Sequence, residues 1–238
     1  MSEHLPDSVR DQIQSGYRQF LASKQLKPRL GQKQMIAAIA NTLSRTIPGS
    51  RLAAIEAGTG TGKTVGYLMA ALPIAKAAGK TVVVATGTVA LQEQLVERDL
   101  PDLLEACGWD YRFALVKGRG RYVCNLRLEQ AADTACSRDQ GLYLFEDELA
   151  FNPDQKTMAL YRELSEGLED GSWNGQRDSW PDRLSDVEWR PLTIDRRQCA
   201  GRRCRHINEC AFYTARNELD ESDCIIANHD LVMADLAL

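Results

Sequence analysis

The first half of the chain contains the segment Ala57-Gly58-Thr59-Gly60-Thr61-Gly62-Lys63-Thr64. Its glycines allow backbone N–H groups to turn inward around an anion without clashes from Cβ atoms. Residues 52–56 before it predict a short buried strand, and apolar residues at helical spacing after it predict a helix whose N-terminus attracts anions. The segment therefore predicts a phosphate-binding loop in which Lys63 contacts the β- and γ-phosphates and the Thr64 hydroxyl holds Mg²⁺.

This phosphate loop does not by itself identify the class of protein. Ala57 occupies a position that is usually glycine, and a glycine-rich turn without a ligand is the alternative interpretation. Loops of this kind occur in kinases, GTPases and motor proteins alike. The choice among these classes therefore depends on the segments on either side of the loop.

The periodicity of the remaining sequence predicts strands that alternate with helices. Besides 52–56, runs of β-branched or apolar residues predict strands over 81–86, 111–116 and 223–227. Apolar residues spaced three and four apart predict helices after each of the first two strands, and two more before the loop. This alternation favours an α/β fold in which a parallel sheet is joined by crossover helices.

Local signals predict where some of these elements begin and end. Asp7 is a candidate N-cap for the first helix, whose apolar residues lie on one face. A second helix is expected over 32–43, followed by a turn at 47–50. Pro73 is expected to end or kink the helix that follows the phosphate loop. A further helix is expected over 91–104.

The alternation breaks after Lys117. Residues 118–215 contain clustered cysteines and tryptophans and some helical stretches, but no β-branched strand. We therefore expect residues 1–117 to form the first part of a main domain, 118–215 a mostly helical insertion, and 216–238 the return to the main domain.

The overall composition excludes several classes of protein. Of the 238 residues, 26% are charged and 44% are hydrophobic, as in ordinary globular proteins and unlike collagen or a disordered chain. Because the net charge is −4, a nucleic-acid partner would have to bind local basic patches. No stretch approaches the roughly eighteen apolar residues of a membrane span, and no secretion signal is present, so we expect a cytoplasmic protein without a membrane partner.

Four of the seven cysteines form a pattern that suits a metal ion or a metal cluster. Cys199, Cys204 and Cys210 are close in sequence, and Cys124 provides a fourth thiol from the other end of the insertion. Four thiolates hold either Zn²⁺ or an iron–sulfur cluster, and the C-x₄-C-x₅-C spacing is looser than in most zinc ribbons, which favours iron. Four unligated thiols in a core are the remaining alternative.

The other three cysteines and one histidine are expected to have structural roles. Cys107, Cys136 and Cys224 are interpreted as packed free thiols. His206 lies between two proposed ligands, and we expect it at the surface or beside the ligands.

Two groups of residues suit contacts with nucleic acid. Thr86, Thr88 and Gln94, at the start of a predicted helix, suit phosphate-backbone contacts, although helix capping is an alternative for the threonines. Basic residues surround the proposed cluster ligands, and they predict salt-dependent, sequence-independent affinity unless acids pair with them. These residues are Lys117, Arg119, Arg121, Arg127, Arg190, Arg196, Arg197, Arg202, Arg203 and Arg205.

In their order along the chain these motifs resemble those of superfamily 2 helicases. The segments 57–64 and 86–94 are similar to that family's motifs I and Ia, and Arg29, Gln32 and Met35 are similar to its adenine-reading element. The segment 118–124, the later cysteines and the pair Asn228-His229 narrow the resemblance to the XPD-like iron–sulfur branch. The resemblance covers essentially the whole chain.

This resemblance implies a fold, a function and a set of cofactors. It implies a RecA-like motor domain with helices on both faces of its sheet, which binds ATP and Mg²⁺ and is interrupted by a domain with one [4Fe–4S] cluster. The implied activity is ATP-driven 5′-to-3′ movement on single-stranded DNA, with unwinding of junctions and R-loops in repair or replication. The implied ATP ligands are Arg29, Gln32 and residues 57–64, and the implied cluster ligands are the four cysteines described above.

One motif of that family does not occur in the sequence. The Asp-Glu-Ala-His box, which supplies the Walker-B acid, is expected shortly after Asn228-His229 and is absent from residues 1–238. We therefore expect an N-terminal fragment that binds nucleotide poorly and hydrolyses it hardly at all. The rival interpretation is a non-catalytic module that binds single-stranded DNA or only holds a cluster. A small-molecule kinase would explain the phosphate loop but neither the cysteines nor the segment 86–94.

Overall fold

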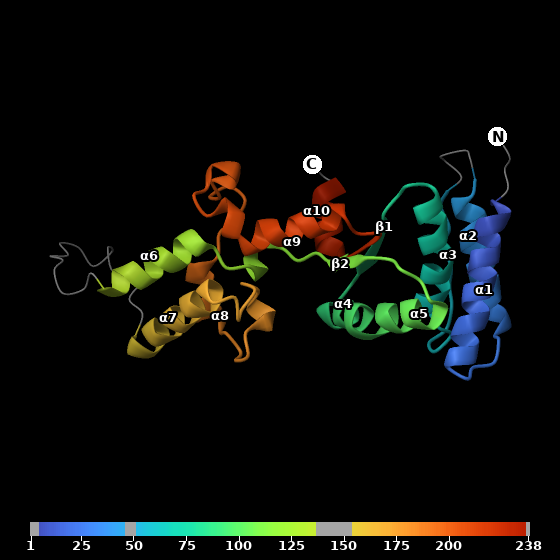
Figure 1. The fold of residues 1–238 in the computed structure, drawn as a ribbon, viewed down its shortest axis with the longest axis horizontal. Coiled ribbons are helices and arrows are strands. Elements are labelled where there is room, and N and C mark those ends of the chain that lie inside the picture. Colours follow the sequence, from blue (N-terminus) through green and yellow to red (C-terminus); the bar gives the residue numbers. More distant parts are fainter. Residues whose placement is uncertain (1–4, 46–50, 137–153, 237–238) are drawn as a thin grey trace. The chain divides into compact units, whose positions relative to one another are not determined.

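The computed structural model describes residues 5–45, 51–136 and 154–236. The turn expected at 47–50 lies outside these residues. The chain folds as two compact units, one formed by Met1–Val116 with Leu219–Leu238 and the other by Lys117–Glu218 (Figure 1). Each unit is described by itself below.

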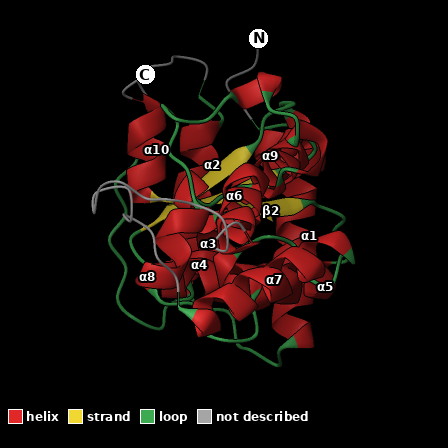
Figure 2. Ribbon diagram, turned by 90° about the vertical axis from the view of Figure 1, so that its left-hand side faces the viewer, coloured by secondary structure: helices red, strands yellow, loops and turns green. Residues whose placement is uncertain are grey.

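A small parallel sheet is the centre of the first unit. Its strands are β1 (Val82–Thr86), β2 (Phe113–Leu115) and β3 (Cys224–Asn228), in the order β1-β3-β2. β3 comes last in the sequence yet lies between the other two and pairs in parallel with both. The strands predicted over 81–86, 111–116 and 223–227 are confirmed, and so is the parallel α/β fold. Figure 2 shows how few strands (yellow) accompany the helices (red).

Helices account for most of the first unit. They are α1 (Asp7–Ser23), α2 (Leu30–Leu43), α3 (Lys63–Ala77), α4 (Val89–Gln94), α5 (Leu100–Cys107) and α10 (His229–Leu236). A π-helical turn at Leu95–Asp99 joins α4 to α5, so that one helical stretch covers the segment predicted at 91–104.

Two signals for helix ends are not borne out: Asp7 is not a cap and Pro73 does not end its helix, while a kink at Pro73 stays a prediction. Asp7 is the first residue of α1 and does not cap it: the N-cap residue is Pro6, and the Asp7 carboxylate accepts a hydrogen bond from Arg10 instead (2.8 Å). α3 continues through Pro73 to Ala77. Proline removes one backbone hydrogen bond, but Leu72 and the other core residues of α3 are fully buried, and this packing keeps the helix intact.

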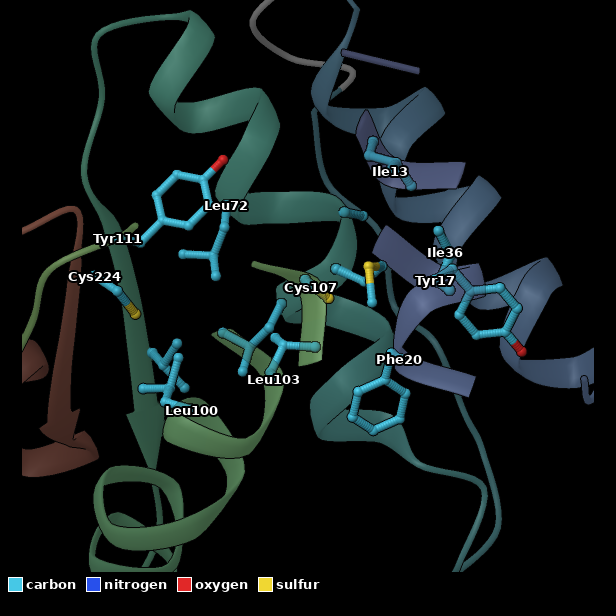
Figure 3. Close-up of a cluster of buried hydrophobic side chains, with 14 of the residues drawn as sticks. Ile13, Tyr17, Phe20, Ile36, Leu72, Leu100, Leu103, Cys107, Tyr111 and Cys224 are labelled. Carbon is cyan, nitrogen blue, oxygen red and sulfur yellow. The ribbon is translucent and has the colours of Figure 1, made fainter. Parts of the chain in front are cut away.

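The hydrophobic core of the first unit lies where α1, α3 and α5 meet the sheet (Figure 3). The predicted apolar face of α1 is buried there, and Tyr17 and Phe20 are each 7% exposed. Leu103 of α5 and Cys224 of β3 are completely buried in the same cluster. These contacts hold the sheet and the start of α3 in one body, and so fix the position of the phosphate loop.

The strand predicted at 52–56 is wrong. These residues form no strand, and Leu52 is 88% exposed. An extended segment becomes a strand only when a neighbouring strand satisfies its backbone hydrogen bonds, and no described strand lies beside this one. β1 is an edge strand whose Val83 is 55% exposed, so the expectation that helices cover both faces of the sheet is not met at β1.

The second unit is mostly helical, as its sequence predicts. It contains α6 (Asn125–Cys136), α7 (Gln155–Glu169), α8 (Asp186–Trp189) and most of α9 (Ala211–Asp220), together with several 3₁₀ turns. Trp173 and Trp189 are buried in its core beside Tyr161 of α7, so these aromatic residues pack in the core and do not present their faces to solvent. No helix in the described part of the chain has the length and apolar composition needed to cross a lipid bilayer.

Candidate nucleotide and cluster sites

The phosphate loop leads directly into α3. Gly60 and Gly62 have positive φ angles of 73° and 75°, a region that residues with a Cβ atom rarely adopt. Gly62 is the N-cap residue of α3, so Lys63 and Thr64 form the first turn of the helix. The helix N-terminus and the glycine-rich turn therefore lie together, as a phosphate site requires.

Lys63 folds back onto its own loop. Its Nζ donates hydrogen bonds to the carbonyl oxygens of Ala57 (3.0 Å) and Gly58 (2.9 Å), and Thr61 Oγ1 also donates to Gly58 O (2.9 Å). The ammonium group is thus held against the loop that would bind an anion. Because the Lys63 side chain is exposed, its ammonium group can exchange these neutral carbonyl acceptors for a negatively charged phosphate, which binds it more strongly.

Two side chains hold the loop from the outside: Arg29, which directly precedes α2, and Gln32, on the first turn of α2. Arg29 Nη1 donates to Gly60 O, and Gln32 Nε2 donates to Gly62 O (3.1 Å). Gln32 is only 7% exposed, and its Oε1 accepts a hydrogen bond from the Tyr17 hydroxyl (3.0 Å). Both residues predicted to bind ATP therefore contact the phosphate loop itself. Tyr17 was not predicted, because in the sequence it appears only as one of the apolar residues of α1.

A separate cavity of about 330 Å³ lies beside this arrangement. Gln32 and Met35 line it from α2, and Ile55 and Ala57 line it from the segment that leads into the loop. Apolar side chains with an amide next to them are a suitable setting for a nucleobase. Arg29 does not line this cavity.

A larger cavity of about 720 Å³ joins the sequence motifs of the first unit. Lys63 and Thr64 line it from the start of α3, Thr86 from the end of β1, and His229 from the start of α10. Thr86 is paired with Asn228 in the sheet, so the two strands end side by side. The carboxyl edge of a parallel sheet is where α/β proteins bind ligands, and here it brings together motifs that are far apart in sequence.

The side chains proposed for backbone contacts with nucleic acid have internal partners. Thr88 is the N-cap of α4 and its Oγ1 accepts a hydrogen bond from Leu91 N (3.3 Å), which is the capping alternative. Thr86 is 8% exposed and donates to Thr88 O (3.1 Å). Gln94 Nε2 donates to Asp99 Oδ2 (3.0 Å). Only Thr88 and Gln94 are exposed, so they are the two that can also reach a ligand.

The four cysteines predicted as ligands line one small cavity of about 30 Å³ in the second unit. Cys199 Sγ accepts hydrogen bonds from Arg119 Nη1 (3.2 Å) and from Gly201 N (3.4 Å). Burial raises the pKa of the Cys124 thiol; two backbone N–H groups lower it, and the nearby Cys204 and Cys210 raise it again. Ionising the Cys124 thiol is therefore unfavourable unless a cation binds beside it.

A mononuclear metal site is not formed by these side chains. In the described residues, no three His, Cys, Asp or Glu side chains lie close enough together to hold one metal ion. Tetrahedral zinc, with Zn–S bonds of about 2.3 Å, would require sulfurs about 3.8 Å apart. In this structure the four cysteines therefore share one cavity without forming a tetrahedral zinc site.

Cys107, Cys224 and His206 lie where the sequence predicts. Cys107 and Cys224 are buried free thiols, and burial raises the pKa of each to about 12. The side chain of Cys136 lies outside the described residues. His206 lines the cysteine cavity, and its Nε2 is 3.1 Å from Glu129 Oε1.

Three of the predicted nucleic-acid contacts are engaged inside the second unit. Lys117 and Arg121 both pair with Asp178, a partner that no sequence pattern identifies. The Arg119 guanidinium, besides its bond to Cys199, lies 3.8 Å from the centre of the Phe212 ring. These cations therefore hold the unit together, and a phosphate would have to compete for them.

Other arginines of the predicted basic group are exposed and lack acidic partners in the described part of the chain. These arginines lie in two short segments around Cys199 and Cys204. Arg205, next to them, pairs with Glu129 instead. The exposed residues are Arg196, Arg197, Arg202 and Arg203.

Comparison with known proteins agrees with the order of the motifs. A protein family described as the type III restriction enzyme res subunit matches residues 25–108, which include α2, the phosphate loop and α4. The ATP-dependent DNA helicase DinG of Photobacterium profundum is 40% identical over 212 residues, which are 89% of this chain and 30% of that protein.

DinG helicases from two further bacteria give nearly the same result. The proteins from Escherichia coli K12 and from Salmonella choleraesuis are each 41% identical over 207 residues, or 87% of this chain and 28% of theirs. This chain thus spans just under a third of the length of the curated relatives that it matches. It is therefore homologous, over nearly nine tenths of its residues, to ATP-dependent DNA helicases named DinG, and the family resemblance of its motifs is confirmed.

Proposed function

We propose that this chain contributes the nucleotide site and part of the DNA site of an ATP-dependent helicase that moves 5′-to-3′ on single-stranded DNA. The observation that carries this proposal is the cavity of about 720 Å³ that Lys63 and Thr64 share with Thr86 and His229. A motor must couple the state of its nucleotide to the segments that hold its substrate. Here the phosphate loop and the ends of two strands face the same space.

In this proposal each residue around the loop has a separate role. Lys63 leaves the carbonyls of Ala57 and Gly58 and neutralises the β- and γ-phosphates, and the Thr64 hydroxyl binds Mg²⁺. Arg29 and Gln32 hold the loop carbonyls in place, and Gln32 also borders the space for the base.

The unit Lys117–Glu218 is proposed as the domain that holds a [4Fe–4S] cluster. Its four ligands would be cysteines that share one cavity, and the N–H donors on Cys199 suit a coordinated thiolate. The cluster, when bound, would link the 3₁₀ turns Gly201–Arg203 and Ile207–Glu209 to the start of α6. The ligands are Cys124, Cys199, Cys204 and Cys210.

Metal analysis tests this assignment directly. Purified protein should contain iron and acid-labile sulfide and absorb visible light, and each of the four Cys→Ser substitutions should remove the iron. The matched control is Cys107→Ala, a buried thiol of the other unit, which should keep it. A colourless protein with one equivalent of zinc would refute the iron assignment.

Single-stranded DNA is proposed to contact the exposed arginines next to the cluster ligands. The variant Arg202→Ala/Arg203→Ala should lower the slope of log affinity against log salt by about 1.4, since each phosphate contact on a single strand contributes about 0.7. The control Arg162→Ala/Arg183→Ala removes the same charge from exposed positions of the same unit and should leave the slope unchanged. Equal slopes of log affinity against log salt in both variants would show that Arg202 and Arg203 do not contact the DNA.

The central experiment measures ATP binding and ATP hydrolysis by the 238-residue chain, with and without single-stranded DNA. We expect weak Mg²⁺–ATP binding and very slow hydrolysis, because the sequence contains no Asp-Glu-Ala-His box. Rapid DNA-stimulated hydrolysis would contradict that expectation. Bound iron and DNA without any ATP binding would favour the non-catalytic module instead.

A further inference from the structure

A groove runs between α1 and α2 in the first unit and shares no lining residue with the cavities described above, although the hydroxyl of its Tyr17 also bonds Gln32. Both helices pack against α3, and a cavity of about 540 Å³ lies between them. Ile13 and Tyr17 of α1 and Ile36 and Ala40 of α2 form its apolar floor. None of these four residues is more than 9% exposed, so the floor is made of well-packed side chains.

The two sides of the groove are straight rows of exposed residues. Arg10, Gln14 and Arg18 follow one another four residues apart along α1. Residues four apart lie on the same face of a helix, so each row runs along the groove. The corresponding row on α2 consists of Lys33, Ala37 and Asn41.

Among the residues that the structure describes, every charged side chain that lines the groove is basic, and none is an aspartate or a glutamate. Arg10 bonds to Asp7 at 2.8 Å, outside the groove, whereas Arg18 and Lys33 have no acidic partner among the residues that the structure describes. One uncompensated cation therefore lies on each side of the apolar floor.

We propose that this groove is the docking site for an acidic amphipathic helix of a partner protein. An apolar stripe on that helix would lie on the floor, and carboxylates flanking the stripe would pair with Arg18 and Lys33. Two parallel rows of residues suit a helix, and the distance along α2 from Lys33 to Asn41, about 12 Å, corresponds to two helical turns of anchors. A nucleic acid would match the charge but has no apolar stripe for the floor.

The low exposure of the floor determines what kind of complex to expect. Little apolar area remains to be buried, so charge pairing must contribute much of the affinity. The complex should therefore be weak and should dissociate as salt is raised, because exposed ion pairs are screened.

The test uses a fluorescein-labelled helical peptide of about 15 residues, near the minimum length for a helix in water. It carries leucine at every third or fourth position and glutamate on both sides of that stripe. Fluorescence anisotropy with the 238-residue chain should show binding that weakens from about 50 to about 200 mM salt. The same peptide with lysine in place of glutamate should not bind.

Variants of the protein locate the binding site. Arg18→Glu/Lys33→Glu should weaken binding about tenfold or more, since two attractive pairs become repulsive. The control Lys80→Glu/Arg98→Glu changes the charge equally at exposed positions that do not line the groove, and should bind as the wild type does. Ala37→Trp should also block binding, because its indole would fill the groove.

Several results would overturn the proposal. These are no binding of the acidic peptide, equal binding of the lysine peptide, or equal loss of affinity in the groove variant and the control. Self-association in sedimentation experiments that Ala37→Trp abolishes would assign the groove to a second copy of the chain. None of these measurements uses nucleotide, DNA or iron, so their outcome is independent of the proposed helicase function.

Discussion

The substitution Gly62→Ala probes how the phosphate loop is held. Gly62 has a φ of 75°, and a Cβ atom at this position would lie 2.4 Å from Gln32 Nε2. Gln32 is buried and cannot simply move into solvent, because its amide bonds both Gly62 O and the Tyr17 hydroxyl. The added methyl group must therefore break these two bonds as well as strain the backbone.

The structure allows the two costs to be separated. An alanine in the left-handed region costs about 1–2 kcal/mol relative to glycine. Loss of the two Gln32 hydrogen bonds adds about 2 kcal/mol. Gly79 is the matched control, since its φ is 60° and a Cβ there would meet no atom within 4 Å. Gly79→Ala should therefore lower the free energy of unfolding by only about 1–2 kcal/mol, and Gly62→Ala by roughly 3–4 kcal/mol.

Denaturant unfolding of both variants measures the difference, and a double-mutant cycle assigns it. In a Gln32→Ala background the obstacle to the methyl group is gone, so the cost of Gly62→Ala should fall to that of Gly79→Ala. ATP affinity, measured by calorimetry, should drop at least about tenfold in Gly62→Ala because the loop backbone shifts. Equal unfolding costs for the two glycine variants would refute the reasoning that Gln32 clamps the loop.

Three further outcomes follow from single side chains. Lys63→Ala should abolish ATP binding in calorimetry. It should not change the free energy of unfolding, because the Lys63 side chain is exposed. Unchanged ATP affinity would refute the assignment of this loop as the nucleotide site. Tyr17→Phe should weaken ATP binding about fivefold through the loss of one hydrogen bond to Gln32, and an unchanged affinity would show that Gln32 needs no support. Burial raises the pKa of Asp223, but its bonds to Lys76 and to a backbone N–H bring that pKa below the ordinary value of 3.8. The stability that Asp223 contributes is therefore present above its unfolded-state pKa and is lost as the pH falls through its folded-state pKa. In Asp223→Asn, the free energy of unfolding should therefore decrease less steeply as the pH is lowered through this range.

Much of the fold could be predicted because its signals are local. The apolar face of α1, the β-branched run of β1 and the phosphate loop all depend on neighbours within one or two turns of chain. The prediction failed at 52–56, where the run is apolar but no strand in the described part of the chain lies beside it. The expected helix end at Pro73 was also wrong, because the sequence does not show that the helix around it is buried.

The candidate site was predicted in part for a similar reason. The ligand types and their spacing are visible in the sequence, and the four cysteines do share one cavity. The structure also joins residues that lie about sixty or more positions apart in the sequence. Arg119 bonds to Cys199, and Lys117 and Arg121 bond to Asp178. No local pattern records such pairs.

By itself the sequence determined which chemical groups this protein possesses and the order in which they occur: a glycine-rich loop ending in Lys63-Thr64, a threonine-rich segment after a strand, and four spaced thiols. Only the tertiary structure decided which of these groups are free to act. Packing of α1 and α2 on α3 turns Tyr17 and Gln32 into supports of the loop, and insertion of β3 between β1 and β2 brings His229 to the phosphate site. The physical reason is that chemistry belongs to individual side chains, whereas proximity arises from contacts between segments that are distant in the chain.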